Sequence, residues 1–271
     1  MMQGAWVSLT VGFVAVGISI AIGIFMGGIA GYYGQLPIGL HHTMALLLPS
    51  AGAAVAGSVS TAGGLALAAI GIAWLLAGLL LKRRAPALTS ALSRPIMSID
   101  TLIMRIVDIM LCFPSFFLIL TVVALLPASL YNIMIVIGLT SWMGTTRFVR
   151  AEFLSLREQD FVAAAKALGV NELRIIFLHM MPNAIAPVLV SATLGIASAI
   201  LTEAGLSFLG FGVPPPHATW GNILSDGKRF IFDAPWLTFA PGTVILLVVL
   251  AFNLFGEGLR DVLNPRLRER H

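Results

Sequence analysis

Two acidic residues stand inside apolar stretches of the chain, where a carboxylate needs a hydrogen bond, an ion pair or a role on a polar path. Glu203 lies in "ASAILTEAGLSF", and Asp108 follows Arg105 by three residues. That spacing puts Asp108 and Arg105 on one face of a helix and predicts an ion pair between them. For Glu203 two interpretations remain open: a buried hydrogen bond or pair across helices, or a polar element of a translocation path.

Enzymatic chemistry finds little support in the sequence. The closest acid pair near an apolar stretch is Asp100 and Asp108, with Asp100 at the edge of that stretch. The histidines considered as metal ligands are His41, His42, His179 and His217. They show no His-x-x-x-His spacing and no carboxylate cluster. The chain also has no G-x-x-x-x-G-K-[ST] phosphate loop. We therefore expect no catalytic residues, and neither a metal nor a nucleotide bound by this chain.

A charged segment, "REQDFVAAAKALGVNELRIIFLHMMPNA", interrupts the apolar text at 157–184. A short helix should begin near Asp160, because an acid there complements the helix dipole. Gly169 suits the C-cap that ends it. The i, i+3, i+4, i+7 spacing predicts one apolar face made of Phe161, Ala164, Ala165 and Leu168.

Such a helix could lie on the membrane, pack on its own bundle or dock into a groove of a partner. Helices that lie on a membrane surface usually carry several basic residues, whereas Lys166 is the only one within 160–169. Docking is therefore the preferred interpretation. A polar rim around the docking face is predicted to consist of Arg157, Asp160, Lys166 and Glu172.

The composition indicates that most of this chain is solvated by lipid. Of its 271 residues 58% are hydrophobic and only 10% are charged, against roughly 25% charged residues in soluble proteins. The mean hydropathy is +0.97. Long continuous apolar runs favour a polytopic α-helical membrane protein over a β-barrel. The net charge of +4 then indicates basic loops facing an anionic leaflet rather than nucleic-acid binding.

The basic residues fall in three clusters, within 82–105, 147–174 and 260–270, and only Lys228 and Arg229 lie elsewhere. The positive-inside rule places all three clusters on the cytoplasmic side of the cytoplasmic membrane. An even number of crossings must then separate successive clusters. The predicted spans are 6–30, 106–126, 130–146, 184–211 and 237–256, with one or two more within 43–81.

The segment "FVAAAKALGVNELRIIFLHMMPNA" resembles the EAA loop of ABC importer permeases, whose EAA…G…LP-type pattern forms a coupling helix. Other stretches occur in the matching order, among them "IDTLIMRIVDIMLCFPSFFLI", "ILTEAGLSFLGFGVPPPHATWGNILSDG" and "NLFGEGLRDVLNPR". Together they are similar to the DppC/OppC branch of dipeptide and oligopeptide permeases over 4–34 and 98–268. The resemblance implies an all-α bundle of the type I ABC importer (MetI-like) class with a cytoplasmic coupling helix.

The resemblance also implies a division of the chain. Residues 4–34 would be the first transmembrane segment, 35–97 an atypical apolar insertion with one or two spans and a basic loop, and 98–271 a permease core with four transmembrane helices. The EAA loop would occupy about 147–182. Its expected ATPase-coupling residues are Asp160, Phe161, Ala163, Ala164, Ala165, Lys166, Leu168 and Gly169. Glu203 and Asp108 are the candidates for the translocation path.

The family pattern implies import of di- or oligopeptides with several partners. These are a second permease of the DppB/OppB kind, two ATPases of the DppD/DppF kind that hold ATP and Mg, and a substrate-binding protein. The departures are Ala163 in place of the family's leading Glu, the insertion at 35–97, and a start at "GAWVSL" without the usual preceding helix and polar segment. Two alternatives stay open: import of nickel chelates or another small solute, and a non-transporting orphan subunit.

Overall fold

The computed structural model describes residues 1–39 and 95–263. The spans predicted within 43–81, the basic loop after them, His41 and His42 lie outside the described residues. The described elements, in chain order, are α1 (Met2–Tyr33), β1 (Pro37–Gly39), β2 (Pro95–Ser98), α5 (Ile99–Cys112), α6 (Ser115–Leu125), α7 (Leu130–Arg157), α8 (Asp160–Ala167), α9 (Glu172–Arg174), a π-helical turn (Ile175–Met180), α10 (Met181–Phe208), α11 (Trp220–Gly227), a 3-10 turn (Lys228–Phe230) and α12 (Trp236–Leu263).

The chain divides into two units, 1–32 with 105–271, and 33–104. The first, called the main unit here, is entirely helical where it is described, as predicted from the composition. The second unit contains a short antiparallel pair in which Pro37 of β1 lies opposite Ser98 of β2. This strand pair, at the two ends of the predicted insertion, has no counterpart in the sequence-based expectation of an all-α chain.

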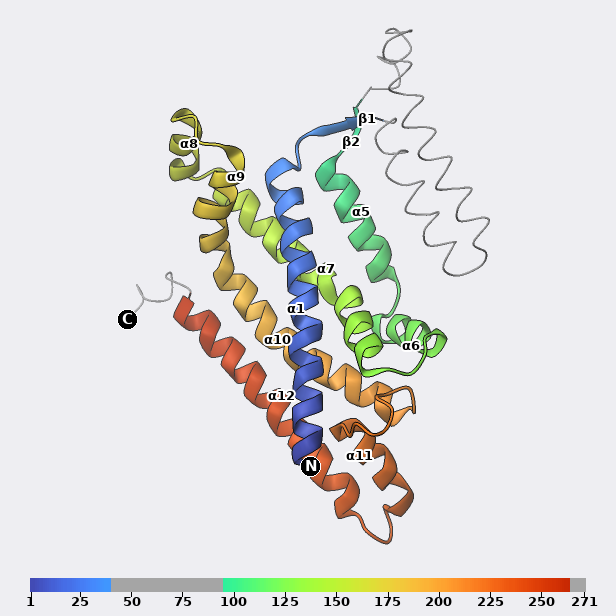
Figure 1. The fold of residues 1–271 in the computed structure, drawn as a ribbon. Coiled ribbons are helices and arrows are strands. Elements are labelled where there is room, and N and C mark those ends of the chain that lie inside the picture. Colours follow the sequence, from blue (N-terminus) through green and yellow to red (C-terminus); the bar gives the residue numbers. More distant parts are fainter. Residues whose placement is uncertain (40–94, 264–271) are drawn as a thin grey trace. The chain divides into compact units, whose positions relative to one another are not determined.

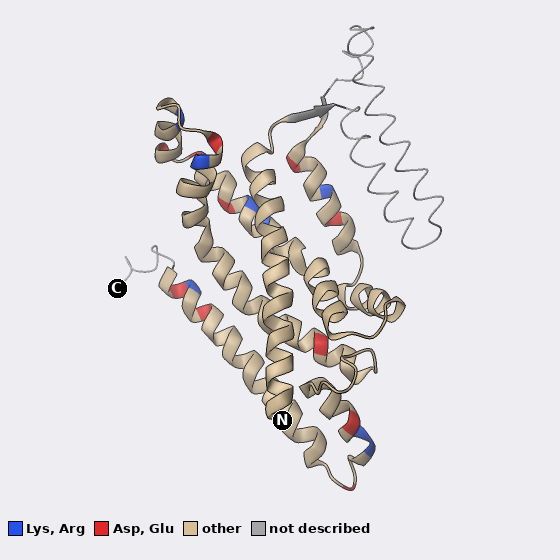
Figure 2. Ribbon diagram, viewed as in Figure 1, with Lys and Arg blue, Asp and Glu red and all other residues tan. Residues whose placement is uncertain are grey.

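Helices α1, α7, α10 and α12 form the main unit's bundle, with α8 and α9 at one end and α11 at the other (Figure 1). Charged residues mark α8, α9 and the C-terminal end of α12, whereas α1 carries none along its length (Figure 2). The core is aliphatic and is built by Val11 of α1, Ile137 of α7, Ile200 of α10 and Ile245 of α12. In α1, α8, α9 and α12 the charged side chains are therefore concentrated where the bundle ends.

Glycines on one face of α1 let it approach α7 closely. A Cβ atom added at Gly27 would stand 2.6 Å from the carbonyl oxygen of Thr146, and one at Gly31 would stand 2.5 Å from the Cβ of Phe153. In lipid, small residues permit such contact and van der Waals packing then holds the helices together. The small-residue repeat of α1 therefore serves helix packing.

Three described helices are long and apolar enough to cross a membrane: α1, the continuous helix Glu172–Phe208, and α12. The segment before Pro182 thus continues into α10 through the π-helical turn, and Pro182 stands in the first turn of α10. A fourth candidate span is α5 with α6, bent by 82°. α7 is less apolar and is not among these candidates, so its crossing stays a prediction.

The prediction of a single unbroken span at 106–126 is wrong, because this stretch contains a sharp bend. Pro114 does more than kink this helix: α5 ends at Cys112, Pro114 is the N-cap of α6, and the two axes differ by 82°. Proline has no N–H to bond and drives the preceding residue, Phe113, out of the helical region. A broken or re-entrant span results.

Candidate functional site

The short helix α8 is closed by the glycine predicted to cap it. Gly169 has φ of +73°, in the left-handed region that glycine adopts without strain. The amide of Val170 donates to the carbonyl of Ala165 at 3.1 Å, and the amide of Gly169 donates to that of Lys166 at 3.0 Å. This pair of bonds is a Schellman motif, which satisfies the last carbonyls of the helix and stops it.

The two faces of α8 differ from those predicted. Val162 and Ala165 are buried, at 0% and 7% exposure, whereas Phe161 and Leu168 are 41% and 83% exposed. Ala165 is therefore a packing residue and not part of a docking face, which corrects the prediction. It lies one turn after Val162, so the two share the inward face.

The remaining residues of the segment lie at the surface. Ala163 and Ala164 are exposed, as are Asp160, Lys166 and Glu172. The outward face of α8, defined here as Phe161, Ala164 and Leu168, is thus exposed on the surface of this chain.

Two residues predicted for the polar rim instead reach back to α1. The Arg157 guanidinium donates to the carbonyl oxygen of Tyr32 at 3.2 Å. The ammonium of Lys166 lies 5.4 Å from the centre of the Tyr32 ring, within cation–π range. The prediction that these two cations surround the docking face is wrong. Arg157, the last residue of α7, and Lys166, near the end of α8, both contact the last turn of α1, and a cation at that end of α1 also complements its dipole.

Glu203 is fully buried among hydroxyl groups at the α11 end of the bundle. The hydroxyl of Ser207 donates to its carboxylate at 2.6 Å and that of Ser8 at 3.4 Å. The Ser8 oxygen in turn accepts from the amide of Trp220 at 3.2 Å. Glu203 therefore joins α1, α10 and α11, and the structure supports the interpretation of a buried hydrogen-bonded group.

Asp108 pairs with a residue other than the one predicted. Its carboxylate accepts a 2.7 Å charged hydrogen bond from Arg147 of α7, and both side chains are about half exposed. Arg105, three residues away on α5, is not its partner. The i, i+3 rule considers only neighbours within one helix, whereas Arg147 lies 39 residues further along the chain, on another helix.

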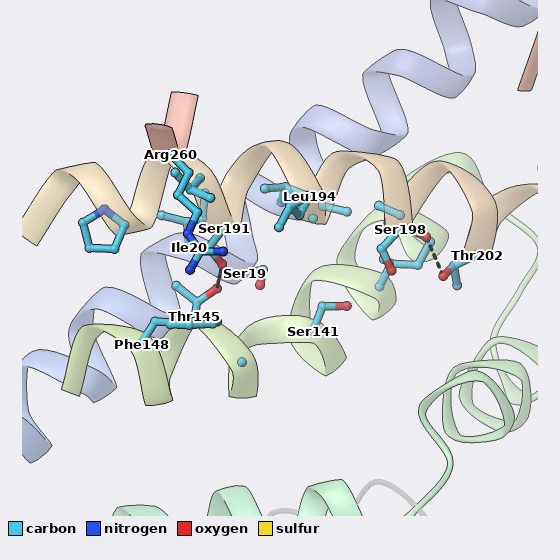
Figure 3. Close-up of a pocket in the computed structure, with 18 residues that line it drawn as sticks. Ser19, Ile20, Ser141, Thr145, Phe148, Ser191, Leu194, Ser198, Thr202 and Arg260 are labelled. Atoms are coloured by element: carbon cyan, nitrogen blue, oxygen red, sulfur yellow. Dashed lines mark hydrogen bonds between the residues drawn. The ribbon is translucent and has the colours of Figure 1, made fainter. Parts of the chain in front are cut away.

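A cavity of about 690 Å³ opens between α1, α7 and α10, and Glu203 and Asp108 are not among its lining residues. Its polar lining consists of Ser19, Ser141, Thr145, Ser191, Ser198, Thr202 and Arg260. Thr145 and Ser191 face each other with their oxygens 3.4 Å apart (Figure 3). Sequence analysis missed these hydroxyls. The signal was there, because Ser191, Ser198 and Thr202 recur at helical spacing within an apolar run.

A family profile now identifies the chain's relatives. The profile described as "Binding-protein-dependent transport system inner membrane component" matches residues 86–269, more than half of the chain. The chain belongs to this family. Its members are inner membrane components, so the predicted multi-pass membrane location is confirmed, and the chain is a permease component rather than an ATPase subunit.

Curated relatives share substantial identity over part of their length. The dipeptide transport system permease protein DppC of Alkalihalophilus pseudofirmus is 50% identical over 170 residues, which are 63% of this chain and 56% of the relative. The oligopeptide transport system permease protein OppC of Bacillus subtilis is 41% identical over the same shares. DppC of Haemophilus influenzae is 43% identical over 63% of this chain and 58% of the relative. The chain spans between half and three fifths of the length of these relatives.

A solved structure shares the fold. A chain of the MetNI methionine ABC transporter in an inward-facing conformation matches with a TM-score of 0.58 over 97% of this chain and 95% of that chain. The identity is 13%, so the likeness concerns the fold alone. It confirms the predicted MetI-like bundle.

Proposed function

We propose that this permease is the transmembrane subunit of an ATP-driven importer that moves di- or oligopeptides across the cytoplasmic membrane. The family match and the DppC and OppC relatives at 41–50% identity support this proposal. Two permease subunits, this chain and one of the DppB/OppB kind, would enclose the path. A substrate-binding protein would deliver the peptide on the outer side.

The outward face of α8 is the observation that carries the proposal. An exposed Leu168 and a partly exposed Phe161 sit on a short capped helix whose opposite face is packed into its own chain. Large apolar side chains held out this way mark an interaction surface. The one lysine of α8 points to Tyr32, so the outward face offers no cation to anionic lipid headgroups. A helix-sized groove on a protein partner fits this face best.

The partner for this groove is an ABC ATPase subunit. Two such subunits, of the DppD/DppF kind, would each accept one coupling helix and would hold ATP and Mg themselves. Their closure on ATP would push α8. Because Lys166 of α8 and Arg157 at the end of α7 both contact Tyr32 of α1, that push would reach α1 directly. Through the α1–α7 contact it would tilt the bundle between inward-open and outward-open states.

Co-purification of the complete complex tests this proposal. The unaltered permease should retain both ATPase subunits and support peptide uptake. Leu168→Asp should reduce retention by about tenfold or more, as expected for a central apolar contact. Phe232→Asp is the matched control, because Phe232 is also largely exposed but follows the 3-10 turn after α11, and α11 lies at the other end of the bundle (Figure 1). Full ATPase retention and normal uptake in Leu168→Asp would overturn the coupling role of α8.

A further inference from the structure

The cavity of the main unit has the size and lining of a site for a small polar solute. Its volume of about 690 Å³ falls within the range of about 300–1,000 Å³ typical of ligand sites. Two of its lining glycines, Gly144 and Gly195, leave room that side chains would otherwise fill. Six hydroxyl groups from α1, α7 and α10 give the apolar wall hydrogen-bonding capacity along its length.

One cation lies at this cavity. The Arg260 side chain comes from α12 and points toward the end occupied by Thr145 and Ser191, while Ser141, Ser198 and Thr202 lie toward the other end (Figure 3). Arg260 forms no ion pair with any residue in the described part of the chain. Its guanidinium therefore keeps its hydrogen-bond donors available for a ligand.

The chemistry of this end selects a carboxylate. A guanidinium presents a planar fork of N–H donors that matches the two oxygens of a carboxylate. The Thr145 and Ser191 hydroxyls beside it share one hydrogen bond, which leaves one hydroxyl hydrogen as a further donor. The rest of the cavity is apolar with scattered hydroxyls, which suits a peptide backbone with small side chains better than a second strong charge.

A simpler role for Arg260 is to complement the helix dipole, since it lies in the last turn of α12. That role needs only a positive charge near the terminal carbonyls. The observed side chain instead lines the cavity beside Thr145 and Ser191. If Arg260 only complements the helix dipole, its replacement should not change how the cavity binds a carboxylate. If Arg260 binds a ligand, its replacement should weaken that binding.

We propose that Arg260 binds the C-terminal carboxylate of the transported peptide at one end of this cavity, and that the hydroxyls of α7 and α10 contact the peptide backbone. This inference rests on the proposed function as a peptide importer. It adds a specificity residue, because a peptide whose carboxylate is blocked as an amide loses the charge that Arg260 recognises.

Protection of an introduced cysteine tests this site without relying on transport. The only cysteine, Cys112, is exposed and is replaced by serine. Ser191→Cys then places a thiol beside Arg260, and its labelling by a small maleimide is followed by mass spectrometry. The sample is the complete complex in nanodiscs of zwitterionic phosphatidylcholine, so that no anionic headgroup competes for the guanidinium.

Trialanine in tenfold excess over its Kd should occupy about 90% of the sites and slow labelling about tenfold. Trialanine amide should need about tenfold higher concentration for the same protection, and Arg260→Gln should remove this difference between the two peptides. Equal protection by trialanine and its amide in the unaltered site would overturn the proposal. An Arg260→Gln protein that still distinguishes them would do the same.

The outcomes separate this inference from the proposed function. Normal trialanine uptake without any protection at Ser191→Cys overturns the carboxylate site and leaves the importer standing. A complex that assembles yet takes up no peptide overturns both. Retention of the ATPase subunits by Arg260→Gln confirms that the variant is folded.

A steric plug gives an independent check of where the solute passes. Gly144 lines the cavity and a Cβ atom there would meet no atom within 4 Å, so the side chain of Gly144→Leu starts in open space at the cavity wall. It should lower trialanine uptake about tenfold or more. Gly17→Leu is the matched control, because a Cβ there also has open space but Gly17 is not among the cavity's lining residues. Equal uptake by the two variants would place the path elsewhere.

Discussion

Lys166 of α8 holds its ammonium nitrogen 5.4 Å from the centre of the Tyr32 ring, at the last turn of α1. The same residue, Tyr32, accepts a hydrogen bond on its carbonyl from Arg157. Helix α8 and the end of α7 that leads into it are therefore both tied to the last turn of α1.

Removing the Tyr32 ring should loosen α8. A partly exposed cation–π contact contributes about 0.5–1 kcal/mol, so Tyr32→Leu should speed amide hydrogen exchange in α8 roughly two- to fivefold. Tyr32→Phe keeps an aromatic face for the cation and is the matched control. Unchanged exchange in Tyr32→Leu would show that the ring does not hold the helix.

The C-cap glycine should tolerate no side chain. Gly169→Ala forces a Cβ into the left-handed region, at a cost of about 1–2 kcal/mol. The last turn of α8 should fray, and hydrogen exchange at the amides of Gly169 and Val170, which donate to its last carbonyls, should become faster. Gly17→Ala lies in an exposed helix interior with open space and should instead stabilise its helix by up to about 1 kcal/mol. A stabilising Gly169→Ala would refute the Schellman motif.

Adjacent glycines of α1 offer a paired test of the α1–α7 contact. A Cβ at Gly27 would stand 2.6 Å from a carbonyl oxygen of α7, whereas one at Gly28 would make an ordinary 3.6 Å contact with Phe153. Gly27→Ala should destabilise the protein by about 1–3 kcal/mol. Its melting temperature in detergent should fall below that of Gly28→Ala. Equal melting temperatures would contradict the close approach of the two helices.

Glu203 should matter as a hydrogen-bond acceptor at the α11 end of the bundle. Glu203→Ala leaves buried hydroxyls, including that of Ser207, without their acceptor, which costs about 1–3 kcal/mol. Glu203→Gln keeps one oxygen acceptor in nearly the same volume and should lose less. The melting temperatures of Glu203→Ala and Glu203→Gln in detergent, each compared with the unaltered protein, test this difference. A larger loss in Glu203→Gln than in Glu203→Ala would contradict the role of Glu203 as a hydrogen-bond acceptor.

Local features of the candidate site could be predicted from the sequence, whereas contacts between distant segments could not. The C-cap role of Gly169 could be predicted, because a glycine that follows an apolar helical repeat commonly ends the helix in the left-handed conformation. The sequence places Ala165 on the wrong face of α8. Helical spacing shows which residues share a face, but it does not show which face packs against the rest of the chain. Val162 and Ala165 form an equally regular i, i+3 pair, and only the packing of α8 on α7 and on the π-helical turn decides between them.

The same limit explains the charged residues. Asp108 has Arg105 three residues before it in the sequence, but it forms its ion pair with Arg147 of α7. Arg157 and Lys166 look like solvated charges in the sequence, and their common target, Tyr32, lies more than a hundred residues away. Arg260 was grouped with the basic residues of a cytoplasmic terminus, and nothing local connects it to Ser191.

Site-specific cross-linking tests the central claim that the outward face of α8 docks into an ATPase subunit. In a Cys112→Ser background, Leu168→Cys carries a benzophenone maleimide and the complete complex is irradiated. We predict a covalent adduct between this chain and an ATPase subunit. No such adduct is expected from Phe232→Cys, whose exposed side chain follows α11 and its 3-10 turn. An adduct with lipid alone at Leu168→Cys, or an equal ATPase adduct from Phe232→Cys, would contradict the account.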